Sequence, residues 1–497
     1  MTNQLPAYSK VFILGAGIAG IGLAIKLKEA GHDDYVVADR GHTVGGTWRD
    51  NTYPGASCDV PSQLYSFSFA PNKQWSRSFS PQPEIQSYLE SVTNEAGVRD
   101  HFYFNTEVTK MRWDEDTHKW LITTSNGETT SSALILASGS LSAPKLPEIE
   151  GINDFAGEIW HSAEWNHDFD LAGKRLAVIG TGASAIQIVP EIADQLDHLD
   201  VYQRTAPWVI PRHDREYGKA ERAALKMIPG LGKLYRSSIR FGRETYVPAF
   251  TFAKQLGKPL QAMAERHIAK GLTKPELRKA VQPPFQIGCK RILVSNDWYP
   301  ALSRQNVDLV TAPITRITKD AIQTADGSTR QVDAIVMCTG FHATDHPVAD
   351  LIFGRKGLQL AEHWRWHGAS AYKGTTVPGF PNLFQITGPN TVLGHTSMIE
   401  IIEAQIGYIT AALDYMSALD LTSIEPKENL TLAYNHELRL DLGKTIWNTG
   451  GCASWYLDDS GRNTTIWPKT AIAYAKQMAK FDAAAYNLTD RNDLTTH

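Results

Sequence analysis

The sequence contains few cysteines. Its four, Cys58, Cys289, Cys338 and Cys452, are widely spaced, and no two of them form a C-x-x-C pair. So small a number argues against a disulfide framework of the kind that stabilises small secreted proteins, and we therefore expect a reducing, cytoplasmic location. The missing C-x-x-C pair also argues against a dithiol redox centre of that type.

Long apolar runs and an excess of positive charge are also lacking. Outside the N-terminal run, the sequence has no stretch of 18 apolar residues, so we expect no membrane-spanning helix. The apolar run after Lys10 has the outline of a signal peptide, but its closely spaced glycines predict a strand, a turn and a helix instead. The net charge of −4 argues against a strongly basic nucleic-acid-binding protein, so we expect no nucleic-acid partner.

The chain is long enough for two or three domains, because it has 497 residues, of which 42% are hydrophobic and 21% charged. Its charge is unevenly spread, since residues 212–282 hold 16 Lys and Arg against 6 acids. Such a run is typical of a solvated helical insertion, and AERAALKMI and LQAMAERHIAKGL within it predict helices. Two alternatives stay open: steering of an anionic cofactor, or peripheral contact with an anionic membrane.

A dinucleotide-binding motif lies near the start of the chain. The buried strand VFIL is followed by Gly15, Gly17 and Gly20 in G-x-G-x-x-G spacing, and then by a helical pattern. The next strand, YVVAD, ends at Asp39, 24 residues after Gly15. In this fingerprint the glycines let the backbone approach a pyrophosphate at a helix N-terminus, and the acid binds a ribose hydroxyl. The motif predicts a site for a plain adenosine ribose, as in FAD.

The same layout occurs a second time with the opposite charge at its end. RLAVIGTGASA places Gly180, Gly182 and Ala185 at the three motif positions. The following strand leads to Arg204, 24 residues after Gly180, where the first motif has its acid. A guanidinium there complements a 2′-phosphate through charge-assisted bonds, so this motif predicts an NADP(H) site.

Two further strands, LILASG (134–139) and AIVMCTGF (334–341), end in small residues and glycine, as strands do that carry the chain between two such domains. We therefore expect an α/β protein with two Rossmann-like dinucleotide-binding domains, one for FAD and one for NADP, and a helical insertion. The expected division is an FAD-binding domain over 1–143, an NADP-binding domain over 144–210 and 286–341, a helical insertion over 211–285, and over 342–497 the second part of the FAD-binding domain with a C-terminal substrate-pocket segment.

Two loops carry the residues best suited to bind a cofactor or to take part in catalysis. GGTWRDNTYPGASCD (45–59) offers a tight turn, the flat face of Trp48 and, after the rigid YPG, the carboxylate of Asp59. FQIGCKRILVSNDWY (285–299) places Lys290 beside Arg291, and adjacent side chains diverge, so one can face a phosphate while the other faces a flavin. From the residues alone, the first loop could equally be purely structural, and Lys290 and Arg291 could equally be an ordinary pair of surface cations.

These loops resemble those of a known family. GTWRDNTYPGASCD fits the Baeyer–Villiger monooxygenase pattern G-x-W-x-x-x-x-[FY]-P-[GM]-x-x-x-D at every fixed position. FAGEIWHSAEWN (155–166) is similar to the family fingerprint F-x-G-x-x-x-H-x-x-x-W-[PD], filled by Phe155, Gly157, His161 and Trp165. The chain departs from the fingerprint at Asn166, and at Ser57 typical members carry arginine. The resemblance covers nearly the whole chain and is weakest over 211–285 and after about residue 410.

The resemblance implies roles for particular residues. The residues implied to line FAD are Gly15, Gly17, Gly20, Asp39, Gly46, Thr47, Trp48, Asp59 and Tyr65, with Val108 and Met398 nearby. Those implied to hold the NADP pyrophosphate region are Thr181, Gly182, Ser184 and Gln187, and those implied at the 2′-phosphate are Arg204, Thr205 and Lys290. Arg291 is implied as the catalytic arginine, positioned by Asp59, the second catalytic residue.

The family's reaction makes physical sense of Arg291. NADPH reduces FAD, O2 adds to give an anionic C4a-peroxyflavin, and this species attacks a ketone to yield an ester or lactone. A fixed positive charge favours the anion and then the oxyanion of the addition step, and arginine stays protonated throughout. The resemblance therefore implies an NADPH- and O2-dependent monooxygenase that acts on a small-molecule ketone.

Four points stay open. An S- or N-oxygenating flavin-containing monooxygenase is the nearest alternative function, and a sulfide or amine would then be the substrate. A pyridine nucleotide–disulfide reductase also has two nucleotide sites, but it needs a dithiol near the flavin. His161 either packs between domains or transfers a proton, while Trp455 and Tyr456 either line the substrate pocket or belong to the core. We expect no metal site.

Overall fold

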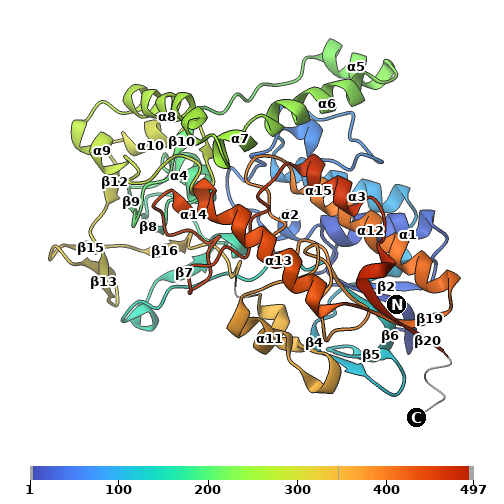
Figure 1. Cartoon of the computed structure of the whole chain (residues 1–497). Coiled ribbons are helices and arrows are strands. Elements are labelled where there is room, and N and C mark those ends of the chain that lie inside the picture. Colours follow the sequence, from blue (N-terminus) through green and yellow to red (C-terminus); the bar gives the residue numbers. More distant parts are fainter. Residues whose placement is uncertain (1–3, 345, 492–497) are drawn as a thin grey trace.

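The computed structural model describes residues 4–344 and 346–491, so the outermost positions of the predicted ranges 1–143 and 342–497, and residue 345, lie outside the described residues. Two sheets, each covered by helices, lie side by side, and a helical arm projects above them (Figure 1). The predicted α/β class with two Rossmann-like folds is confirmed.

The first sheet contains the N-terminal glycine motif. Its strand order is β17-β4-β5-β6-β1-β2-β3, with β18 paired to β6, and β1 pairs in parallel with both β2 and β6. Helix α1 (Ile18–Glu29) covers one face together with α12 (Met398–Ala418), so segments nearly 400 positions apart pack together. The strands are β1 (Tyr8–Leu14), β2 (Tyr35–Ala38), β3 (Phe102–Tyr103), β4 (Val108–Asp114), β5 (Lys119–Thr124), β6 (Gly127–Leu136), β17 (Ile352–Phe353) and β18 (Leu383–Gln385).

The second sheet contains the other glycine motif. It is entirely parallel in the order β12-β9-β8-β16-β7, and α4 (Ala185–Ile192) packs its apolar side chains into the same core. An antiparallel three-stranded unit follows it, β13 (Ile314–Ile317), β14 (Ala321–Thr324) and β15 (Thr329–Gln331). The strands of the main sheet are β7 (Glu158–His161), β8 (Arg175–Ile179), β9 (His198–Tyr202), β12 (Val307–Val310) and β16 (Ala334–Met337).

The basic segment is helical. It forms α5 (Lys219–Met227), α6 (Leu231–Glu244), α7 (Val247–Phe250), α8 (Lys258–Gly271) and α9 (Pro275–Ala280). Helices α5 and α6 make up the projecting arm, residues 219–244, drawn in green at the upper right of Figure 1. Helix α8 packs against the second sheet's side of the molecule, where Ala264 and Ile268 are buried in the same core as α4.

The C-terminal part crosses from one domain to the other. Helices α13 (Glu428–Gly443) and α14 (Ile446–Thr449) lead away from the first sheet, and α15 (Ala471–Met478) returns to pack on α12. Strands β19 (Leu421–Pro426) and β20 (Tyr486–Asp490) close this part as an antiparallel pair. Among the helices of the described residues, none combines the length and apolar character needed to cross a membrane.

One disulfide joins two segments that the sequence analysis did not pair. Cys289 and Cys452 are bonded across 163 positions of sequence, whereas Cys58 and Cys338 are free and buried. The four cysteines make no framework, but two of them meet because the C-terminal segment folds back over the loop that precedes Lys290. Their separation in sequence gave no signal of this pairing.

Candidate active site

The first glycine loop has the backbone that its motif requires. Gly15 has a φ of +112°, and a Cβ there would lie 2.6 Å from the carbonyl oxygen of Ala137. A Cβ on Gly20 would lie 1.9 Å from the carbonyl oxygen of Gly15, which explains the close packing of α1 on β1. Gly46, with a φ of +54°, brings a second loop within contact of Gly17, because its Cβ would lie 3.0 Å from the Gly17 Cα. The two loops thus form a narrow cradle without side chains, which suits a pyrophosphate.

Asp39 lies beside this cradle and is already well bonded. Its Oδ2 accepts from the backbone N–H of Ala16 at 2.7 Å, and its Oδ1 accepts from the Gly41 N–H and from Arg49 Nη1, both at 2.7 Å. A carboxylate has about four acceptor positions, so Oδ2 can still accept one ribose hydroxyl. Burial opposes the charge of Arg49, but its bonds to Asp50 and Asp39 raise the pKa of Arg49 overall. The sequence reasoning missed Arg49, although it lies within the quoted loop.

The other residues implied at the flavin divide into two places. Thr47 and Trp48 begin the short helix α2 (Thr47–Asp50), and Trp48 Nε1 donates to the Tyr65 hydroxyl at 2.9 Å. Met398 begins α12, and its sulfur accepts from the Leu393 N–H at 3.3 Å. Trp48, Tyr65 and Met398 pack with one apolar cluster, whereas Val108, at the start of β4, is buried in another. The predicted contact of Val108 with FAD stays a prediction.

The second glycine loop has a similar backbone but more open space. Gly180 has a φ of +113°, and a Cβ there would lie 2.3 Å from the carbonyl oxygen of Cys338. A Cβ on Gly182 would meet no atom within 4 Å. Thr181 is buried and donates weakly, at 3.4 Å, to the carbonyl oxygen of Thr205, while Ser184 directly precedes α4. The loop therefore presents an uncovered backbone to solvent at the N-terminus of α4.

Two cations meet near this loop. The pKa of Lys290 is lowered, first by burial and then by repulsion from Arg204. Lys290 lies over the Phe285 ring at 5.2 Å, whereas Arg204 is exposed. Within the described residues, no carboxylate is recorded in contact with either group. Two facing positive charges without an anion between them are unfavourable, and a phosphate dianion would relieve the repulsion.

The loop that precedes Asp59 joins the two domains. Gln187 on α4 donates from Nε2 to the Ser57 carbonyl oxygen at 3.0 Å, and its Oε1 accepts from the Tyr53 hydroxyl at 3.0 Å. Arg212 donates to Ser57 Oγ at 3.1 Å and to the Cys58 carbonyl oxygen at 3.3 Å. The Gln187 amide therefore faces the neighbouring domain, and its expected contact with NADP stays a prediction. Sequence reasoning missed Arg212, because it lies after the second motif and belongs to no recognised sequence pattern.

Arg291 and Asp59 meet between the two domains. Arg291 Nη2 donates to Asp59 Oδ1 at 2.6 Å. The Arg291 side chain is 42% exposed and that of Asp59 is 22% exposed. Attraction to Asp59 raises the pKa of Arg291 against the opposing effect of burial. Arg291 is thus a permanently charged guanidinium, and Asp59 binds one of its nitrogens.

Three tyrosines lie near this pair, of which Tyr456 is buried and Tyr53 and Tyr65 are half-buried. Burial raises the pKa of Tyr53 and of Tyr456 to about 12, and it raises the pKa of Tyr65 as well, while the charge of Arg291 opposes the rise in each. The Tyr65 hydroxyl accepts from Trp48, so the charge of Arg291 acts on a side chain that is bonded to the loop 45–59. Tyr456 comes from the C-terminal segment, where its ring centroid lies 4.5 Å from that of the partly exposed Trp455. All three hydroxyls stay neutral at ordinary pH.

The residues of the fingerprint segment 155–166 contact neighbouring backbone and aromatic rings of the fold. A Cβ on Gly157 would lie 2.3 Å from the Asp333 carbonyl oxygen, and the Phe155 ring also covers that position. His161 ends β7, where its Nδ1 accepts from the Ala163 N–H at 3.1 Å and its ring meets Phe341 edge to face. Burial lowers the pKa of His161, so the ring is neutral. Trp165 packs against the Trp160 ring at 5.7 Å.

One group in the second domain has the composition of a metal site. His198, Asp200 and Asp308 bring their ligand atoms within 4.8 Å of one another. Arg330 Nη1 already donates to Asp200 at 2.7 Å and to Asp308 at 2.9 Å. The guanidinium supplies the positive charge that a cation would bring, so the group is an ion-pair network.

The fold and the site together define a class of protein with two dinucleotide cradles and an arginine–aspartate pair between them. The family described as pyridine nucleotide-disulphide oxidoreductase matches residues 12–219. A Baeyer-Villiger monooxygenase of Streptomyces coelicolor is 45% identical over 98% of this chain and 94% of its own length. The chain belongs to the Baeyer–Villiger monooxygenase family.

Solved structures agree with this assignment. The crystal structure of OTEMO in complex with FAD and NADP has a TM-score of 0.87 and 27% identity, and the match covers 98% of this chain and all of the other. A cyclohexanone monooxygenase bound to epsilon-caprolactone has a TM-score of 0.84 and 27% identity, over 97% of this chain and all of the other. The region matched to the oxidoreductase family contains one cysteine, Cys58, so it lacks the dithiol of a disulfide reductase.

Proposed function

We propose that this protein uses FAD, NADPH and O2 to insert an oxygen atom next to a ketone carbonyl, which gives an ester or lactone. The observation that carries the proposal is the Arg291–Asp59 bond of 2.6 Å at the junction of the two dinucleotide folds. The family assignment and the lactone bound to the cyclohexanone monooxygenase support a ketone as the substrate class.

The chain's residues fit the two cofactors. The side-chain-free cradle of Gly17 and Gly46 suits the FAD pyrophosphate, and Asp39 has an acceptor position left for a ribose hydroxyl. Arg204 and Lys290 suit the 2′-phosphate that distinguishes NADPH from NADH. When bound, FAD takes up the electrons of NADPH and activates O2, which no side chain of this protein can do.

Arg291 supplies charge where the reaction develops it. A guanidinium in a cleft stabilises a neighbouring anion and then the oxyanion that forms on the ketone oxygen. Asp59 accepts from Nη2, which fixes the orientation of Arg291 and leaves its other N–H donors for a ligand. The neutral Tyr53, Tyr65 and Tyr456 add no competing negative charge.

The experiment compares Arg291→Ala with wild type in the presence of NADPH, O2 and a cyclic ketone. We expect FAD content and NADPH oxidation to persist, while ester or lactone formation falls at least about a hundredfold. Arg316→Ala, on the exposed strand β13, is the matched control and keeps wild-type product formation. Wild-type ketone oxidation by Arg291→Ala would sink the assignment.

The substrate class needs a separate measurement. Wild-type protein is given a ketone, a thioether and an amine in parallel, and the products are identified by mass spectrometry. Lactone or ester from the ketone supports the proposal. Oxygenation of the thioether or amine without any product from the ketone indicates the flavin-containing monooxygenase alternative.

The cytoplasmic location expected from the cysteine content stays a prediction. The Cys289–Cys452 bond bears on it directly, because disulfides persist mainly in oxidising compartments. Titration of accessible thiols in freshly prepared, denatured protein, with and without reductant, measures whether this bond is present in cells.

A further inference from the structure

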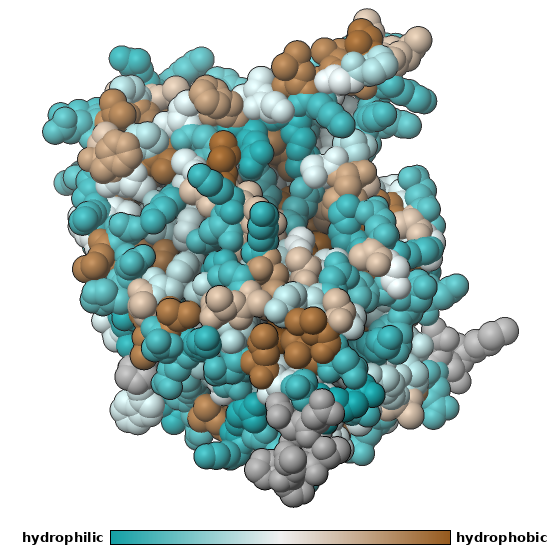
Figure 2. All heavy atoms as spheres, turned by 45° about the vertical axis from the view of Figure 1, so that its right-hand side comes forward, coloured by the Kyte–Doolittle hydropathy of each residue, from teal (hydrophilic) through white to brown (hydrophobic). Residues whose placement is uncertain are grey.

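The outer face of the α5–α6 arm is apolar. Leu234 and Phe241 on α6 are 68% and 71% exposed, and they share one helix face because they lie two turns apart. At the turn between the two helices, Met227 is 76% exposed and Ile228 is 53% exposed. Figure 2 shows apolar residues gathered over the projecting end of the arm. Large apolar side chains grouped on a projecting element indicate an interaction surface.

The arm is held rigidly by its inner face. Arg236 donates to the carbonyl oxygens of Gln63 at 3.0 Å and Ser66 at 2.8 Å. Arg240 forms a 2.7 Å ion pair with the buried Glu400 on α12. The inner face of α6 is thus fixed to the flavin domain, and the outer face of the arm stays directed away from the protein.

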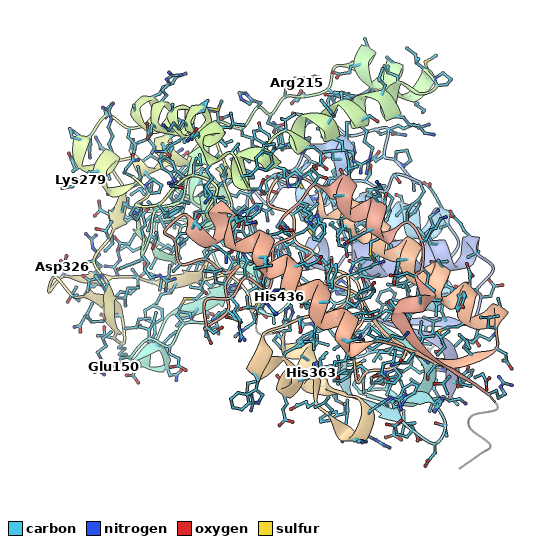
Figure 3. The ribbon with its side chains drawn as sticks, in the orientation of Figure 1. Glu150, Arg215, Lys279, Asp326, His363 and His436 are labelled. Carbon is cyan, nitrogen blue, oxygen red and sulfur yellow. A yellow bond between two sulfur atoms is a disulfide. The ribbon has the colours of Figure 1, made fainter. Side chains whose placement is uncertain are left out.

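Positive charge gathers where α5 lies near residues 73–74. A shallow hollow of about 270 Å³ is lined by Gln74 and Ala223 and by four cations, Lys73, Lys219, Arg222 and Lys226. The arm contains two acids, and both are engaged. Glu221 accepts two bonds of 2.7 Å from Arg215, which Figure 3 labels at the root of the arm, and Glu244 is buried. Among the described residues, no acid of the arm is thus left to neutralise these four cations.

We propose that the α5–α6 arm docks this protein on an anionic membrane surface. The hollow has the charge and size to receive lipid phosphate groups, while Met227, Ile228, Leu234 and Phe241 enter the boundary between headgroups and acyl chains. An apolar face bordered by Lys and Arg is the composition of helices that lie in this boundary. Each cation near an anionic leaflet adds to the attraction, and the apolar side chains make the attachment resistant to salt. This inference goes beyond the proposed reaction and does not depend on it.

The test is sedimentation of the full-length, FAD-loaded protein with vesicles. Vesicles of phosphatidylcholine alone are compared with vesicles that also contain phosphatidylglycerol, each at low and high salt. We expect binding to the anionic vesicles, with a fraction that persists at high salt. The triple variant Lys219→Gln, Arg222→Gln and Lys226→Gln binds at least about thirtyfold more weakly at low salt. The variant Met227→Ser, Leu234→Ser and Phe241→Ser loses the salt-resistant fraction.

Matched controls separate the arm from overall charge and hydrophobicity. The variant Lys270→Gln, Lys274→Gln and Lys279→Gln removes the same charge from residues 270–279, at the end of α8 and along α9, and Figure 3 labels Lys279 far from the arm. The variant Leu432→Ser and Leu440→Ser removes exposed apolar side chains from α13. Both controls bind vesicles like wild type, and all variants keep the FAD content and melting temperature of wild type.

Several results overturn the proposal. The first is failure to bind anionic vesicles at low salt, and the second is an equal loss of binding in the control variants. Saturable binding of inorganic phosphate without vesicle binding assigns the hollow to free anions. Self-association that the apolar triple variant abolishes, without vesicle binding, assigns the face to a second copy of the chain.

Discussion

The two dinucleotide folds share a backbone and differ in what surrounds it. In the first, Asp39 is buried and accepts from Ala16, Gly41 and Arg49, and Gly46 closes on Gly17. In the second, Arg204 is exposed and faces Lys290. The first site is therefore completed by the protein itself, whereas the second is completed only by its ligand.

This difference matches the duties of the two proposed cofactors. A flavin that is retained through many turnovers needs a cradle that is rigid before binding, because preorganisation lowers the cost of holding a ligand. A coenzyme that must enter and leave gains from an open loop such as that around Gly182. The same arrangement of strand, loop and helix thus suits retention of FAD in the first domain and exchange of NADP(H) in the second.

The strongest test of this contrast is Asp39→Ala. The variant removes the ribose acceptor and leaves Arg49 with Asp50 as its remaining carboxylate partner. We expect loss of FAD on gel filtration and a fall of roughly 3 kcal/mol in the free energy of unfolding measured in urea. Asp50→Ala keeps the Asp39–Arg49 pair and serves as the control. Full FAD content and unchanged stability in Asp39→Ala would show that the first site is not built around this carboxylate.

Arg204→Ala makes the matching change in the second site. Because Arg204 contributes no bond to the fold among the described residues, stability should not change. We expect NADPH to bind at least about tenfold more weakly, since a charge-assisted bond to the 2′-phosphate is lost, while NADH binding barely changes. Titration of both coenzymes measures this, and an equal loss for NADH would contradict it.

Arg212→Gln tests the junction between the two sites. The guanidinium holds Ser57 and Cys58, which precede Asp59, so its loss loosens the loop that orients Arg291. We expect kcat to fall roughly threefold to tenfold, as for a slightly misplaced catalytic group, with coenzyme binding and FAD content retained. Arg77→Gln is the control, because Arg77 shares the Asp214 ion pair but does not bond to residues 57 and 58. An equal effect of both variants would assign the change to Asp214.

The smallest expected effect is a pH dependence of NADPH affinity. Lys290 has a lowered pKa, and only its charged form attracts the 2′-phosphate. Lys290 is charged below that pKa, so NADPH affinity should fall a fewfold as pH rises through it, whereas NADH affinity should not. Arg204→Ala removes the repelling charge and should move the fall to higher pH. Parallel titrations of the two coenzymes across the alkaline range measure both shifts, and a fall shared by NADH would contradict this role of Lys290.

The sequence predicted what depends on local spacing. The glycines and strands of both motifs form a continuous stretch, so the pattern alone indicated both cradles and the positions of Asp39 and Arg204. The meeting of Arg291 with Asp59 is a contact across 232 positions, and it came from the resemblance to a family.

Contacts between distant segments account for what was missed. The disulfide joins positions 163 apart, and Arg212 contacts Ser57 across 155. Gln187 turned toward Ser57 because α4 lies against the neighbouring domain, which no periodicity reveals. Such pairings are set by how two domains pack, and a single sequence carries no spacing that reports it.

The bond between Cys289 and Cys452 makes a covalent ring of the chain from the loop before Arg291 to the segment of Tyr456. A single protease cut anywhere inside that ring leaves one molecule under non-reducing conditions, and the two fragments separate only after reduction. Arg291 and Tyr456 thus stay on one covalently linked molecule even when the polypeptide between them is broken.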